Sequence, residues 1–180
     1  VIDETPGYRR GIAFYRKFIL YDRSWDKRKI ILHFNGIAVK AEVYLNNILI
    51  KAHLGAYTAF DVDITDNLLI NQPNELLIKV DNSVSLGEIV PPVSGDFSMF
   101  GGIYRSVYLE IINKIHFENE TFANTGIMAT TPHVSTENAT MQITGTIYNE
   151  SLKTENLILK NTLEDRTGSE ITSSKQKIKV

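Results

Sequence analysis

The chain of 180 residues is 43% hydrophobic and 22% charged, and its formal net charge is -2. This balance is typical of a globular protein and excludes the basic surface that nucleic-acid binding needs, while no apolar run reaches the roughly 18 to 20 residues of a membrane-spanning helix. The sequence contains no cysteine, which excludes disulfides, thiol nucleophiles and Cys-ligated zinc.

Apolar residues recur at every second position in the first half of the chain, which is the period of a β-strand with one buried face. Between positions 39 and 45 they alternate with two charged residues and a tyrosine. Asn46 and Asn47 then form a turn pair that tolerates left-handed backbone, so a hairpin is predicted there. No segment keeps a 3.6-residue apolar stripe over three turns, which argues against long helices. The strands predicted in this half are 11–20, 29–34, 38–45, 48–50, 74–80 and 104–112.

The amino-acid composition changes after Ile112: aromatic residues become rare, and Thr, Asn, Ser and Glu surround apolar residues that still alternate. We therefore place a domain boundary between residues 113 and 114. Many short strands without helical crossovers favour antiparallel sheets packed face to face. The predicted fold is all-β: a jelly-roll β-sandwich over residues 1–113, followed over 114–180 by an immunoglobulin-like β-sandwich that ends before its last strands. The strands predicted in this second part are 115–120, 126–135, 140–148, 157–162 and 169–179.

Segment 91–105 holds the densest group of residues that a plain strand or turn does not need. Two prolines at its start restrict the backbone, whereas Gly101 and Gly102 allow positive φ or the close approach of another backbone. Asp96 is therefore predicted to lie in a shaped loop. Two interpretations stay open from the residues alone: a binding loop, or a connection in which the acid caps a turn.

No motif for catalysis or metal binding appears elsewhere in the chain. The histidines lack the spacing of zinc ligands, so each is interpreted as a surface or half-buried strand residue. No serine elbow, phosphate loop or dinucleotide fingerprint is present, and no two acids can be argued to share a pocket as glycoside hydrolysis requires. We therefore predict no catalytic residue, no metal site and no cofactor. The histidines are His33, His53, His116 and His133.

The chain contains five segments whose order and spacing are informative: 11–18, 34–38, 43–47, 53–65 and 96–107, the last of which contains the run Gly-Gly-Ile-Tyr-Arg. Taken together, they resemble the N-terminal sugar-binding domain of glycoside hydrolase family 2. Members of this family include β-galactosidases, β-glucuronidases and β-mannosidases, and they consist of a jelly roll, an immunoglobulin-like sandwich and a TIM barrel with two catalytic glutamates. This chain departs from the family at Ala56 and Ala59, where a glycine and a proline are common.

The resemblance implies a galactose-binding-like jelly roll and the start of the sandwich, without the barrel. On this basis we interpret the chain as the non-catalytic N-terminal fragment of a retaining exo-β-glycosidase, above all a β-galactosidase, that hydrolyses terminal β-glycosides. Its partner would be the terminal sugar, bound together with the absent barrel. Asp96 matches the acid that contacts this sugar in β-galactosidases, and Arg105 is either a second sugar contact or a charge that fixes the loop.

Two rival functions use the same fold: a stand-alone carbohydrate-binding module, and an adhesion sandwich without a ligand. A reading frame that continues past Val180 into a barrel would favour the glycosidase, and a nearby stop codon would favour the module. We expect the protein in the periplasm or outside a bacterial cell. Because a truncated second sandwich would have an unpaired edge strand, homo-oligomerisation through that edge is left open.

Overall fold

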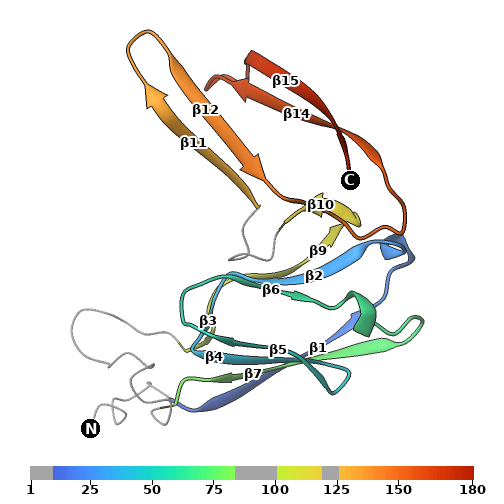
Figure 1. Cartoon of the computed structure of the whole chain (residues 1–180). Helices are drawn as coiled ribbons and strands as arrows, with labels where there is room; N and C mark the ends of the chain where they lie inside the picture. The colour runs from blue at the N-terminus through green and yellow to red at the C-terminus, as the bar shows by residue number, and fades with distance from the viewer. Residues whose placement is uncertain (1–9, 84–100, 119–125) are drawn as a thin grey trace, which may run out of the picture. The chain divides into compact units, whose positions relative to one another are not determined.

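The computed structural model describes residues 10–83, 101–118 and 126–180. These residues divide into two compact units, the first with residues 10–83 and 101–113 and the second with residues 114–118 and 126–180. All their regular elements are β-strands or short 3-10 helices, so the predicted all-β class is confirmed (Figure 1). Within these residues we find no helix that could cross a membrane.

The first unit is an antiparallel β-sandwich with one larger and one smaller sheet. The four-stranded sheet contains, in spatial order, β1 (Ile12–Leu20), β7 (Pro73–Asp81), β4 (Lys40–Leu45) and β5 (Ile48–Leu54). The three-stranded sheet contains, in spatial order, β6 (Phe60–Asp63), β2 (Lys29–Phe34) and β9 (Val107–Ile112). A short pair consists of β3 (Ile37–Ala38) and β8 (Gly102–Ile103), and the 3-10 helices are η2 (Arg23–Trp25) and η3 (Thr65–Asn67).

The core of the first unit lies between its two sheets, because alternate residues of each strand face inward. Phe34 and Phe60 stack there with ring centroids 4.6 Å apart. Trp25 packs against the same cluster, and its ring meets that of Tyr21 edge-on at 5.7 Å. Each large apolar side chain that is fully buried contributes about 1.5 to 3 kcal/mol. The buried cluster consists of Ile19, Ile30, Leu32, Phe34, Ile37, Ala41, Val43, Leu45, Phe60, Val62, Ile64, Leu76, Ile78 and Val80.

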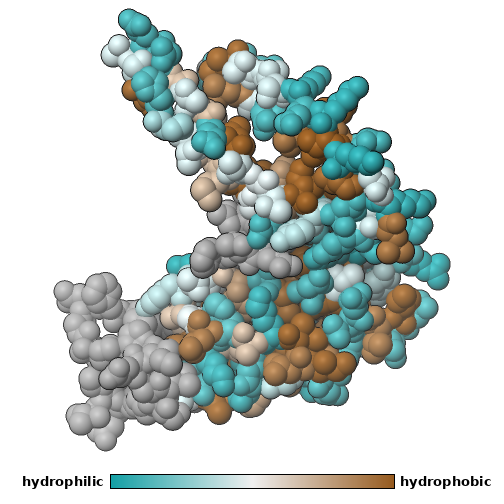
Figure 2. All heavy atoms as spheres, in the orientation of Figure 1, coloured by the Kyte–Doolittle hydropathy of each residue, from teal (hydrophilic) through white to brown (hydrophobic). Residues whose placement is uncertain are grey.

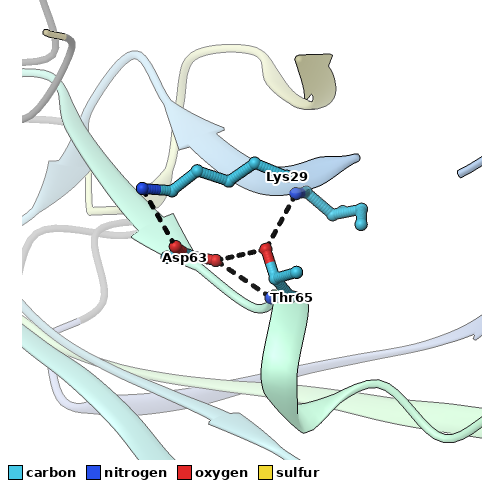
Figure 3. Close-up of polar contacts among 4 residues, drawn as sticks. Lys29, Asp63 and Thr65 are labelled. Atoms are coloured by element: carbon cyan, nitrogen blue, oxygen red, sulfur yellow. Dashed lines mark hydrogen bonds and ion pairs between the residues drawn. The ribbon is translucent and has the colours of Figure 1, made fainter. Parts of the chain in front are cut away.

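β2 is buried on both of its faces. Every residue from Lys29 to Phe34 is buried, so the side that faces away from the core also encloses polar groups. Lys29 Nζ lies 3.4 Å from Asp63 Oδ2. Asp63 Oδ1 accepts hydrogen bonds from Thr65 N at 3.0 Å and Thr65 Oγ1 at 2.5 Å, and Thr65 Oγ1 accepts one from Ile30 N at 2.9 Å (Figure 3). These contacts fix the start of β2 to the end of β6.

β1 forms one edge of the four-stranded sheet, and nearly all its side chains reach the surface. Large apolar residues are among them: Phe14 is 63% exposed and Phe18 is 56% exposed. Figure 2 shows hydrophobic side chains of this kind lying among hydrophilic ones on the face in view. Of the β1 residues, Ile19 alone joins the buried cluster. β1 is therefore held mainly by its backbone pairing with β7.

Three of the predicted strands in the first unit differ from the observed ones by more than one residue, and one of these, 48–50, continues to Leu54 as β5. The predicted strand 38–45 divides at Val39, because β3 pairs with β8 whereas β4 pairs with β7. Val39 joins the two pieces: its N–H donates to Asp81 O at 3.2 Å, and its C=O accepts from Gly55 N at 2.9 Å. The predicted strand 104–112 begins as β9 only at residue 107, after the short strand β8. β6 has no counterpart among the predicted strands, because it is only four residues long and two of them are acidic.

The second unit consists of antiparallel pairs of strands. The pairs are β10 (Ile115–Phe117) with β13 (Ile147–Asn149), β11 (Ile127–Val134) with β12 (Ala139–Gly145), and β14 (Asn156–Glu164) with β15 (Glu170–Lys179). The predicted strand 140–148 is thus divided between β12 and β13. Every residue of β11 and β12 is exposed, whereas a closed sandwich buries one face of each strand. The immunoglobulin-like assignment of this unit stays a prediction.

Glu42, on β4, carries a charge whose partners are all on the four-stranded sheet. Its carboxylate pairs with Lys40 Nζ at 3.0 Å and accepts hydrogen bonds from Tyr44 Oη at 2.8 Å and Lys79 Nζ at 3.1 Å. These contacts, that of Lys40 first, lower the pKa of Glu42 from 4.5 to about 2.

A lowered pKa stabilises the fold above the ordinary pKa of the group, and this contribution is lost as the pH falls through the folded value. We therefore expect Glu42→Gln to lower the free energy of unfolding by about 1 to 2 kcal/mol at pH 7. The difference should shrink as the pH falls from 4.5 toward about 2. Urea unfolding of both proteins at several pH values measures it, and an equal difference at every pH would contradict the assigned role of the carboxylate.

Candidate functional site

The structure describes only part of the predicted site. Asp96 lies outside the described residues, as do Phe97 and Phe100, so contact between Asp96 and a sugar stays a prediction. Arg105 is described, together with the residues that flank segment 84–100. We use the name candidate site for the described residues that meet around those flanks. They are Tyr15, Asn35, Gly36, Ala56, Tyr57, Asn82, Gly101, Gly102, Tyr104 and Arg105.

The residues on the two flanks of segment 84–100 lie against each other. Asn82 follows β7, and its side chain packs on Gly101, where an added Cβ atom would lie 2.1 Å from Asn82 Nδ2. Asn82 Oδ1 accepts a hydrogen bond from Gly11 N at 2.9 Å, and Asn82 N donates to Gly11 O at 3.2 Å. Both flanks of the segment that contains Asp96 are therefore held beside the start of β1.

Tyr15, on β1, fixes the chain where it returns after Gly101. Its hydroxyl oxygen accepts a hydrogen bond from Ile103 N at 3.4 Å. Gly102 has a φ of +83°, and an added Cβ atom there would lie 2.3 Å from Tyr15 Oη. Glycine is the residue that combines such a left-handed backbone with so close an approach. The positive φ that the sequence predicts for this glycine pair is thus found at Gly102, whereas the groups that approach the two glycines closely are side chains and not another backbone.

Arg105 connects two loops of the first unit. Its Nη1 donates hydrogen bonds to Asn35 O and to Tyr57 O, each at 3.3 Å. The guanidinium carbon lies 5.3 Å from the centre of the Tyr104 ring, and the Tyr104 hydroxyl donates to Ala56 O at 2.5 Å. These contacts match the interpretation of Arg105 as a charge that fixes the loop. A direct contact between Arg105 and a sugar stays a prediction.

A buried histidine–aspartate pair lies next to Asn35, and sequence reasoning did not find it. His33 Nδ1 lies 2.6 Å from Asp61 Oδ1, and the two side chains are 8% and 9% exposed. The interpretation of His33 as a surface or half-buried residue is therefore wrong. Burial raises the pKa of Asp61, while the hydrogen bond from His33 acts in the opposite direction. The alternation of apolar and acidic residues over 60–63 was the available signal, because pairing this segment with β2 places Asp61 opposite His33.

An apolar cavity of about 390 Å³ opens beside Tyr15, between the edges of the two sheets. Aliphatic side chains form most of its wall, and they offer no hydrogen-bonding groups to the hydroxyls of a sugar. We therefore do not place the predicted sugar in this cavity. Its lining residues are Tyr15, Arg16, Lys17, Ile19, Leu32, Leu76, Ile78, Ile103, Val107, Tyr108 and Leu109.

The described part of the candidate site offers orientation rather than reaction chemistry. The guanidinium of Arg105 and the hydroxyls of Tyr15 and Tyr104 are all held by main-chain groups. Within residues 10–83, 101–118 and 126–180, no three His, Asp or Glu side chains are grouped as a metal site would require. The arrangement can therefore fix the positions of residues 103–105 and orient the side chains of Tyr104 and Arg105.

Gly102 and Gly168 provide a matched pair for testing the contact with Tyr15. Both have a φ of +83°, but an added Cβ atom at Gly168 meets nothing within 4 Å, whereas one at Gly102 meets Tyr15 Oη. Both alanine variants should lose about 1 kcal/mol for the positive φ, and Gly102→Ala should lose a further 1 to 2 kcal/mol, roughly, from overpacking. Urea unfolding followed by circular dichroism measures both. Adding Tyr15→Phe should recover part of the extra loss at Gly102, and equal losses in the two alanine variants would contradict the contact.

Residues 9–90 match the domain family described as glycosyl hydrolase 2 galactose-binding domain-like. A relative in Formosa agariphila, provisionally named a β-glucuronidase, is 36% identical over 177 residues, which are 98% of this chain and 20% of that relative. A β-galactosidase of Thermoanaerobacter pseudethanolicus is 34% identical over 116 residues, which are 63% of this chain and 15% of that enzyme.

The same likeness is found among solved structures. β-Glucuronidase 2 of Bacteroides uniformis, solved with cyclophellitol-6-carboxylate aziridine bound covalently, has a TM-score of 0.88 and 33% identity over 97% of this chain and 20% of that chain. The chain thus spans about a fifth of the length of these relatives. Sequence and structure together confirm the predicted resemblance: residues 9–90 match the galactose-binding-like domain of glycoside hydrolase family 2, and the chain as a whole is similar to a small part of enzymes of that family.

Proposed function

We propose that this chain is the non-catalytic, pocket-shaping part of a family 2 glycosidase that hydrolyses terminal β-glycosides. The observation that carries the proposal is the extent of the match: 97% of the chain superposes on 20% of a β-glucuronidase. Almost the whole chain therefore corresponds to a small part of a much larger glycosidase. We further propose that the protein acts in the periplasm or outside a bacterial cell.

In this proposal the first unit presents segment 84–100 at the rim of a sugar pocket. The contacts of Asn82 and Tyr15 hold the flanks of that segment, and Arg105 holds the neighbouring loops. Asp96 would supply a carboxylate that can accept two sugar hydroxyls at once, which orients the sugar and selects among epimers. Hydrolysis with retention, by two carboxylates about 5 Å apart, would belong to other parts of the longer protein.

Two terminal sugars are candidates for the pocket. The loop that contains Asp96 resembles that of β-galactosidases, and the Thermoanaerobacter enzyme supports a β-galactoside. The Formosa relative and the Bacteroides enzyme support a β-glucuronide. Assays of the longer protein with 4-nitrophenyl β-D-galactoside and 4-nitrophenyl β-D-glucuronide separate the two, because the sugar with the higher kcat/KM is the one that the complete pocket accepts.

The 180-residue chain on its own should bind neither galactose nor glucuronic acid measurably, because its pocket lacks the groups that the rest of the protein would supply. Isothermal titration calorimetry with each sugar tests this expectation. A Kd of about 1 mM or tighter would instead favour the stand-alone carbohydrate-binding module.

In the longer protein, Asp96→Ala should lower kcat/KM by about 10- to 100-fold, because one charged hydrogen-bond acceptor for the sugar is lost. Its thermal unfolding should stay unchanged. Asp66→Ala is a matched control, since Asp66 is an exposed aspartate that lies on η3, and its kinetics should not change. Unchanged kinetics for Asp96→Ala would remove Asp96 from the site.

A further inference from the structure

An apolar cavity lies between β1 and β9, the edge strands of the two sheets of the first unit. Its volume of about 390 Å³ falls within the range of small-molecule sites, about 300 to 1,000 Å³. Side chains of the buried core form its floor, so among the described residues the core is open to a ligand at this place. The floor consists of Ile19, Leu32, Leu76 and Ile78.

No acidic residue lines the cavity in the part of the chain that the structure describes. The two acids that adjoin lining residues in the sequence are Glu75, beside Leu76, and Glu110, beside Leu109. Leu76 lies in the buried cluster and Leu109 packs against it. Because successive side chains of a strand point to opposite faces, both carboxylates lie on the outer faces of their sheets. The cavity can therefore receive an anion without a like charge on its wall.

Lys17 is the cation on the cavity side of β1. Side chains two residues apart on a strand share a face, and the neighbours of Lys17 on its face are Tyr15 and Ile19, which both line the cavity. Lys17 also pairs in register with Leu76 of the cavity floor. The residue is exposed, and among the described residues its side chain makes no ion pair or hydrogen bond. Its ammonium is therefore available to a ligand.

Arg16, the other cation beside the cavity, lies on the opposite face of β1. Its Nη1 is 3.9 Å from Glu75 Oε1, and its guanidinium carbon is 5.9 Å from the centre of the Phe18 ring on that same outer face. The charge of Arg16 is thus already engaged, which leaves Lys17 as the cation that the described lining offers. An apolar floor beside a single available ammonium suits a ligand with an apolar body and one anionic head.

We propose that this cavity is a binding site for a single-chain amphiphilic anion, an aliphatic carboxylate whose chain lies on the cavity floor and whose head pairs with Lys17. A chain carbon occupies roughly the volume of a water molecule in the liquid, about 30 Å³, so the cavity holds on the order of ten carbons of one chain. A lipid with two long acyl chains exceeds this volume. The proposal does not rest on the proposed function, because no sugar takes part in it.

Isothermal titration calorimetry of the 180-residue chain with hexanoate, octanoate and decanoate tests the proposal. Each pair of added methylene groups should tighten the Kd by about 10- to 15-fold, because one buried methylene group contributes roughly fourfold. Tetradecanoate should gain much less than this over dodecanoate, since the cavity is then full. Absence of decanoate binding, or equal affinities along the series, would overturn the proposal.

Variants separate the role of the Lys17 charge from the general effect of apolar burial. Lys17→Gln should weaken decanoate binding by about three- to tenfold and leave the binding of 1-octanol unchanged, because only the ion pair is lost. Lys27→Gln is a matched control, since Lys27 is an exposed lysine of the first unit outside the cavity lining, and it should change neither affinity. If Lys17→Gln binds decanoate as tightly as the unchanged chain does, the proposal is wrong.

Nuclear magnetic resonance of the isotope-labelled chain locates the bound carboxylate without any variant. On addition of decanoate, the backbone amide signals of Ile103, Val107 and Leu109, which line the cavity, should shift with the midpoint that calorimetry gives. The signals of β15 should not move. Shifts confined to other parts of the chain would overturn the proposal.

Two other occupants of the cavity would be recognised by different results. If a second copy of the chain fills it, sedimentation velocity should show a dimer that dissociates in Val107→Phe, because the larger side chain takes up the cavity. If a membrane surface covers it, vesicles of phosphatidylglycerol should retain the chain even in the presence of saturating octanoate. Either result would overturn the proposal.

Discussion

The burial of β2 on both faces is the constraint on which the first unit depends. A buried charged or polar group costs free energy unless an opposite charge or hydrogen bonds compensate it, and β2 carries Lys29 and His33 on the face away from the core. β6 supplies the compensation with Asp63 and Asp61, two residues apart. A slip of one residue would turn both aspartates toward the core and Phe60 outward. Burial of the apolar face of β2 and pairing of the polar side chains on its other face are therefore both achieved in the same register with β6.

The fixed register of β2 also positions part of the candidate site. β2 ends at Phe34, so its fixed register determines where Asn35 and Gly36 lie, and these two residues receive Arg105 and Tyr104. β9, which follows Arg105 in the chain, pairs with the other side of β2. Arg105 is thus attached to β2 in two ways: through its hydrogen bond to Asn35, and through β9, which follows it in the chain.

Much of the fold could be predicted from the sequence, because the two-residue period of a strand needs only local information. The hairpin at Asn46 and Asn47 is an example, since both residues have the positive φ, 52° and 65°, that their type allows. The His33–Asp61 pair could not be predicted in this way. An acidic residue that alternates with apolar ones normally lies on the solvent-exposed face of a sheet. Only the pairing of strands that are distant in the sequence shows that this face is covered here. Asp96 lies outside the described residues, so its contacts stay a prediction.

Trp25 has a practical consequence of its own. It is the single tryptophan of the chain, and it packs against the core of the first unit, with Tyr21 as its aromatic neighbour. When tryptophan is excited selectively, the fluorescence therefore comes from the first unit alone, because the second unit contains no tryptophan. The melting of the first unit can thus be followed by itself in the intact chain, without a dye or an engineered label.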